Sequence, residues 1–140
     1  MSEYSDFDEA RIRHLELVQG VISRLGTNSF LVKGWAITVS GAFLGFAITE
    51  KKWGLAVISL QTTVLFCGLD AYFLRAERLF RALHDEVLAE KVPPFSMDTR
   101  HLVRSTTTAA WGSVIFSITL RLFYGLLTIS GGAVIAILIC

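Results

Sequence analysis

The sequence predicts an all-α integral membrane protein with three transmembrane helices, an N-terminal amphipathic helix and a cytoplasmic extension of the second span. Hydrophobic residues make up 53% of the 140 residues, and the mean hydropathy is +0.57. A small soluble domain has too much surface to hide that many apolar side chains. The apolar residues also gather in long runs that are separated by short charged segments. We therefore expect residues 1–140 to form a single membrane domain.

Residues 8–25 have the pattern of an amphipathic helix. Their apolar residues recur at helical spacing along one stripe, and the opposite face is polar. The stripe consists of Ile12, Leu15, Val18, Ile22 and Leu25. The sequence GTNS at 26–29 is expected to break this helix, with Asn28 or Ser29 capping the next one.

The first span is expected at residues 30–49, which are apolar except for Lys33. About 20 residues are enough to cross a bilayer as a helix. Lys33 falls in the first turn of the span, where a long side chain can extend to the lipid headgroups. The sequence EKK at 50–52 predicts a tight polar turn at the other end.

The second span is expected at residues 53–74. No glycine or proline follows Asp70 for more than 20 residues, so the helix should continue as a cytoplasmic extension over 75–91. Pro93 and Pro94 would end it, because proline lacks the backbone N–H that a helix interior needs. The apolar stripes of this extension and of the N-terminal helix each need a partner, and packing on each other is the simplest arrangement.

The C-terminal stretch allows two interpretations. One has a loop at 92–108, an interfacial lead-in at 109–121 and a third span at 122–140. A single helix over 109–140 would be about 48 Å long, which exceeds the roughly 30 Å hydrocarbon core. The competing interpretation turns at residues 130–132, SGG, and gives four crossings. We favour three, because the last ten residues are too short to cross comfortably.

The distribution of Lys and Arg predicts the orientation. Residues 1–34 and 75–104 carry most of these cations, whereas the turn at 50–52 has two lysines. By the positive-inside rule, the N-terminus and the 75–104 region lie in the cytoplasm.

With this topology Lys33, Asp70 and Arg121 fall at similar depth, near the cytoplasmic edge of their spans. An ionised group in hydrocarbon costs at least a few kcal/mol unless it is paired or reached by water. We expect an ionic clamp that fixes the register of the helices. The alternatives are a charged gate at the mouth of a pore and simple snorkelling of the cations.

The first span contains GAFLG, a GxxxG motif formed by Gly41 and Gly45. Two membrane helices approach closely where side chains are absent. The motif predicts helix packing, either inside one subunit or between subunits.

Polar side chains also align along the apolar helices. Ser59 and Thr63 share a face with Asp70 in the second span, and Tyr124 lies on a polar stripe near the C-terminus. Such stripes either hydrogen-bond across helices or line a wet path. With three spans in each chain, a water-filled path would require several subunits.

Motifs for catalysis are missing from the sequence. The three histidines are scattered, and neither a nucleophile elbow nor a phosphate-binding loop is present. We therefore expect no enzyme activity, no metal and no cofactor. The net charge of +1 gives no argument for nucleic acid as a partner.

The chain resembles a group of small, functionally uncharacterised bacterial membrane proteins. The resemblance is carried by N-S-F-x-x-K-G-W at 28–35 and by D-A-Y-x-x-R-x-E-R-L-F-R-x-L at 70–83, and it covers roughly residues 14–87. It implies a compact protein of the bacterial inner membrane. The layout is also similar to that of the small transmembrane effectors of antiphage defence, a likeness of architecture rather than of motif.

Two functions follow as hypotheses. The first is a homo-oligomeric pore, or membrane-perturbing effector, that is gated from the cytoplasmic side and serves antiviral defence. The second is a membrane-embedded scaffold whose cytoplasmic helices recruit a soluble protein. Both make the lipid bilayer a partner, and only the first requires a homo-oligomer.

Overall fold

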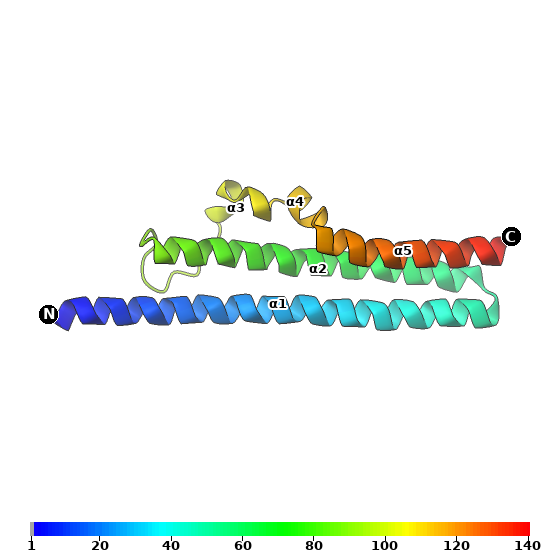
Figure 1. The fold of residues 1–140 in the computed structure, drawn as a ribbon, viewed down its shortest axis with the longest axis horizontal. Coiled ribbons are helices and arrows are strands. Elements are labelled where there is room, and N and C mark those ends of the chain that lie inside the picture. The colour runs from blue at the N-terminus through cyan, green and yellow to red at the C-terminus, as the bar shows by residue number, and fades with distance from the viewer. Residues whose placement is uncertain (1) are drawn as a thin grey trace. The chain divides into compact units, whose positions relative to one another are not determined.

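The computed structural model describes residues 2–140, with side chains from residue 9 onward, and its regular structure is entirely helical (Figure 1). The helices are α1 (Ser2–Glu50), α2 (Trp53–Leu88), α3 (Leu102–Ser105), the 3₁₀ helix η1 (Thr107–Ala109), α4 (Trp111–Ile115) and α5 (Ile118–Ile139). Three of them, α1, α2 and α5, are long and apolar enough to cross a membrane. The expected all-α class and its three apolar helices are confirmed at this level.

Helix α1 runs through the segment where a break was expected. Residues 26–29 are helical, and the predicted cap at Asn28 or Ser29 is therefore wrong. A glycine in a helix costs only about 1 kcal/mol, so neighbouring contacts can outweigh it. The Thr27 hydroxyl donates to the carbonyl of Ser23 one turn earlier, and Ser29 is buried with its hydroxyl bonded to α2.

The polar turn after α1 is confirmed, and the backbone shows how it forms. Lys51 has a φ of 52°, and the N–H of Lys52 donates to the carbonyl of Ala47 at 3.1 Å. A left-handed residue with this hydrogen bond is a Schellman ending, which satisfies a free carbonyl at the helix terminus.

Helix α2 closes in the same way and slightly earlier than the prolines predict. Glu90 has a φ of 57°, and the N–H of Lys91 donates to the carbonyl of Glu86 at 3.0 Å. The helix therefore ends at Leu88 rather than continuing to residue 91. The following segment, expected to be a loop over 92–108, contains α3 and begins η1.

Where one domain was expected, the contacts divide the chain into two compact units. Unit 1 consists of residues 1–27 and 73–114, and unit 2 of residues 28–72 and 115–140. Helices α1 and α2 each contribute one segment to each unit.

Unit 1 has its own apolar core. Buried side chains of α1 and α2 meet there with residues from α3 and η1; they are Val18, Ile22, Leu79, Leu83, Val87, Leu102 and Ala109. The expected packing of the N-terminal helix on the extension of α2 is therefore present. Ile12, placed on the same stripe by the sequence, is 56% exposed instead.

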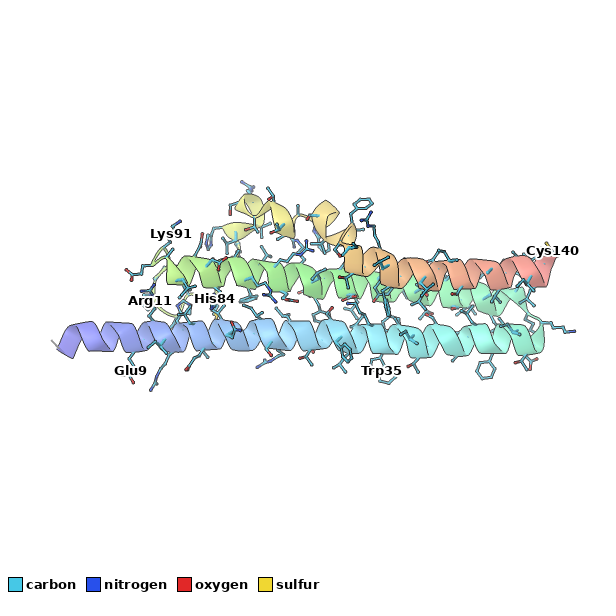
Figure 2. The ribbon with its side chains drawn as sticks, viewed as in Figure 1. Glu9, Arg11, Trp35, His84, Lys91 and Cys140 are labelled. Carbon is cyan, nitrogen blue, oxygen red and sulfur yellow. The ribbon has the colours of Figure 1, made fainter. Side chains whose placement is uncertain are left out.

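Polar contacts hold the irregular segments of unit 1 in place. Arg11 donates to Glu90 and to the carbonyl of Leu88, and thus ties α1 to the end of α2 (Figure 2). Arg75 donates to the carbonyl of Ala109 at 3.0 Å, and its guanidinium lies 4.7 Å from the ring centre of Trp111. These contacts attach η1 and α4 to α2.

Helix α5 is continuous from Ile118 to Ile139 and includes residues 130–132. The turn required for a fourth crossing is absent from the described chain, so that alternative is wrong. The helix also starts four residues before the predicted boundary at 122. The expected lead-in over 109–121 is divided among the end of η1, α4 and the first turn of α5.

Candidate functional site

A buried ion pair in unit 2 is the most specific polar feature of the apolar helices. The Nζ atom of Lys33 on α1 lies 2.6 Å from Oδ2 of Asp70 on α2. The Asp70 side chain is fully buried, and the Lys33 side chain is 19% exposed. The structure therefore brings together two of the three residues expected to form an ionic clamp.

Ser29 completes the pair as a third member. Its hydroxyl donates to Oδ1 of Asp70, and it accepts a hydrogen bond of 2.9 Å from Nζ of Lys33. Ser29 and Lys33 can meet because residues four apart lie on the same helical face. A buried ion pair is tolerable only when further hydrogen bonds satisfy its remaining atoms, and Ser29 supplies such bonds to both partners.

Tyr124 brings α5 to the same region of α2. Its hydroxyl donates to the carbonyl of Phe66 at 3.3 Å. Tyr124 is buried. It was expected as a path-lining residue, but in this unit it joins α5 to α2 beside the ion pair.

Arg121 is not part of this cluster. It lies in the first turn of α5, is exposed, and makes no ion pair within the described side chains. Of the two candidate cationic partners of Asp70, Lys33 makes the ion pair and Arg121 does not, because Lys33 and Ser29 already occupy the carboxylate. Its guanidinium is left at the surface of the helix.

Hydroxyl groups form a second polar contact between α1 and α2. The Ser59 hydroxyl donates to the carbonyl of Ser40 at 2.9 Å, and the hydroxyls of Ser40 and Thr63 lie 3.0 Å apart. All three residues are buried. Ser59 and Thr63, offered as path-lining residues, thus hydrogen-bond across the helices and line no path within one chain.

Gly41 and Gly45 lie on an open face of α1. Both are exposed, and a Cβ atom added at either would meet no other atom within 4 Å. The motif therefore packs no helix within unit 2. Of the two interpretations of this GxxxG motif, packing inside one subunit is wrong, and packing between subunits remains a proposal.

Sequence reasoning missed Ser29 and Ser40. Ser29 was assigned to a helix cap because it follows Gly26 and Asn28, and Ser40 was not singled out. The signal was the spacing: Ser29, Lys33, Ala36 and Ser40 recur every three or four residues along α1, and all but Lys33 are buried. This pattern is a polar stripe facing α2.

The described residues contain no cluster of three or more His, Cys, Asp or Glu side chains suited to a metal ion.

Comparison with known proteins gives no match. Neither a protein-family model, nor a curated protein, nor a solved structure matches the chain.

Proposed function

We propose that this protein is a homo-oligomeric membrane effector whose copies associate through their apolar helices and perforate or perturb the bilayer. In this proposal it resides in the bacterial inner membrane with its N-terminus in the cytoplasm and serves antiviral defence. The charged unit 1 lies on the cytoplasmic side and controls the assembly.

The open face at Gly41 and Gly45 is the observation that carries the proposal. In lipid, helices gain little from hiding apolar surface, and close packing at small residues drives their association. Nothing within unit 2 occupies these two glycines. A second copy of the chain is the expected partner of this face, because it is present in the same membrane wherever the protein is made.

The buried polar groups support a path between copies rather than inside one. Ser40, Ser59 and Thr63 satisfy one another, so a single chain offers no polar lining. Arg121 is exposed and unpaired in the described chain. Several copies would place their Arg121 side chains around a common centre, and rings of arginine favour the passage of anions.

Control from unit 1 is supported by the continuity of two helices. Helices α1 and α2 each run without interruption through residues of both units. The Lys33–Asp70 pair fixes their register in unit 2. A ligand that rearranged α1 against α2 in unit 1 would therefore act on the membrane helices.

The test is dye release from vesicles of phosphatidylethanolamine and phosphatidylglycerol that contain the full chain. Because high protein density favours assembly even without a ligand, the proposal predicts release by the wild type at high density and loss of release in Gly41→Leu/Gly45→Leu. The control is Ala42→Leu, which adds similar bulk at a neighbouring exposed position of α1. Absence of wild-type release, with the protein monomeric at every protein-to-lipid ratio, would contradict the proposal.

The alternative is a membrane-embedded scaffold for a soluble protein. It is favoured by the separate core of unit 1 and by a surface hollow of about 320 Å³, lined by Gln19, Ile22, Arg81, His84 and Asp85. Replacing surface residues of this hollow, as in Arg81→Ala/Asp85→Ala, would abolish recruitment by a scaffold. The same change would leave the vesicle activity of an oligomeric effector intact.

A further inference from the structure

Gln61 is a polar side chain on the outer face of an apolar helix. It lies near the middle of the expected 53–74 span, is exposed, and makes no hydrogen bond within the described part of the chain. It belongs to an open hollow of about 540 Å³ whose other lining residues are Val57, Leu60, Val64 and Leu65. Among these lining residues, Gln61 is the only one with a polar side chain.

An amide at this depth needs a partner that lipid cannot provide. A primary amide carries two donor hydrogens and an acceptor oxygen. Leaving such a group without hydrogen bonds in hydrocarbon is costly. Because the amide holds both donor and acceptor, a second amide can pair with it reciprocally: each NH₂ group donates one of its two hydrogens to the other oxygen.

The surface around Gln61 has the spacing of a helix–helix seam. Gly54, Gln61 and Gly68 are seven residues apart, and a Cβ atom at either glycine would meet nothing within 4 Å. Val57 and Val64 follow Gly54 and Gln61 by three residues, so that the five residues form an alternating three-and-four pattern. This is the pattern of two helices that cross at about 20° with interlocking side chains.

Each element of the seam suits a parallel pair. The glycines allow the two backbones to approach above and below Gln61. The valines supply small knobs of defined shape between them. A single polar residue at the centre of such a seam fixes the register of the two helices and the number of copies.

We propose that two copies of this chain pair through the α2 seam, Gly54–Val57–Gln61–Val64–Gly68, with a reciprocal hydrogen bond between their Gln61 amides. The inference rests on the proposed membrane placement, because copies inserted in the same direction can be related only by an axis along the membrane normal. That symmetry places each residue at the same depth as its counterpart and brings Gln61 to Gln61.

This seam is distinct from the Gly41–Gly45 face, which lies on α1. A protein with one self-complementary face stops at a dimer, whereas two such faces on different helices allow dimers to link further. The seam thus supplies the first step of the assembly, and the glycine face of α1 the second.

Disulfide trapping tests the seam directly. The chain has two free cysteines, Cys67 and Cys140, which are first replaced by alanine. In vesicles under mild oxidation, Gln61→Cys should give a covalent dimer in most of the protein. Leu69→Cys is the matched control, because Leu69 is exposed on α2 but lies outside the seam. Equal trapping at both positions would overturn the proposal.

The role of the amide is tested by association in vesicles, measured by energy transfer between labelled copies. Gln61→Leu should weaken dimerisation by roughly eightfold, the value expected for loss of the two membrane hydrogen bonds between the amides. Gln61→Asn, which retains an amide, should lose less. Unchanged association in Gln61→Leu, with the helical content of the wild type preserved, would exclude the amide pair.

These results separate the seam from the proposed function. Trapping at Gln61 without dye release would uphold the seam and contradict the pore. Dye release that depends on Gly41 but not on Gln61 would uphold the effector and overturn the seam.

Discussion

The Nζ atom of Lys33 and the Oδ2 atom of Asp70 lie 2.6 Å apart and join α1 to α2 within two apolar segments. The lysine keeps 19% of its side chain exposed, whereas the aspartate has no exposed surface. The two residues therefore depend on the pair unequally. Removal of the lysine leaves a buried carboxylate, but removal of the carboxylate leaves a cation that can still turn outward.

This inequality predicts which of two variants loses more stability. Lys33→Met should destabilise unit 2 by about 3–5 kcal/mol, because the Asp70 charge stays buried without its partner. Asp70→Asn should cost less, because the amide still accepts from Ser29 and Lys33 can extend to the headgroups. Thermal unfolding in lipid nanodiscs measures both, and Arg121→Gln serves as the control, with a change below about 0.5 kcal/mol. A larger loss in Asp70→Asn would contradict this description of the pair.

The contact between α5 and α2 makes a second prediction. A Cβ atom at Gly131 would lie 2.5 Å from Cδ2 and 3.0 Å from Cγ of Leu60. Gly131→Ala should therefore destabilise the protein by about 1–3 kcal/mol through overpacking. Gly132→Ala meets nothing within 4 Å, and it should be neutral or slightly stabilising. Chemical unfolding of the two variants in the same detergent compares them, and equal stabilities would contradict a tight contact between Gly131 and Leu60.

Loss of the hydroxyl contact between α1 and α2 should lower the stability slightly and leave the rate of dye release unchanged. Ser40→Ala removes the hydroxyl that lies 3.0 Å from that of Thr63. Interhelical hydrogen bonds in membranes contribute about 0.6 kcal/mol on average, so the melting temperature should fall slightly. Dye release should be unchanged, because these hydroxyls face each other and not a path. Altered release at unchanged stability would show instead that they line one.

In unit 1, the imidazole of His14 holds the segment after α2 through two hydrogen bonds to its backbone. Its Nδ1 atom accepts from the backbone N–H of Phe95 at 3.2 Å, and Nε2 lies 2.9 Å from the carbonyl of Ser96. Because Nδ1 is an acceptor, Nε2 carries the proton and donates. His14→Ala removes both bonds, each of which contributes about 1 kcal/mol.

Limited proteolysis checks the role of His14. Cleavage between residues 91 and 98 should accelerate severalfold in His14→Ala and stay at the wild-type rate in His84→Ala. His84 is the matched histidine, because its nearest ionic contact is Asp85, 4.0 Å away on the same helix. Equal cleavage rates in the two variants would contradict the assignment.

Much of the fold can be predicted from the sequence, because lipid-length apolar runs and helical stripes are strong signals. The three apolar helices, the turn at 50–52 and the packing of Val18 against Leu83 in one core follow from them. The helix through Gly26 and Asn28 does not. Local propensity at those residues is worth about 1 kcal/mol, and a distant partner such as Asp70 overrides it.

The candidate site, like the fold, can be predicted from the sequence only in part. Depth alone places Lys33, Asp70 and Arg121 at one level, but depth does not say which cation reaches the carboxylate. The direction of the side chain decides this. Lys33 shares with Ser29 the face of α1 that is turned toward α2, whereas Arg121 is exposed at the surface of α5. Likewise, GxxxG predicts close packing at Gly41 and Gly45 without saying whether the partner belongs to the same chain.

If copies of this protein act together in a membrane, as proposed, the rate of dye release must depend steeply on protein density. Vesicles of fixed lipid composition would carry increasing amounts of the wild-type chain. Because assembly of several copies precedes release, the initial rate should rise more steeply than the second power of protein density. A rate that rises in simple proportion to density, or no release at any density, would show that the copies do not act together.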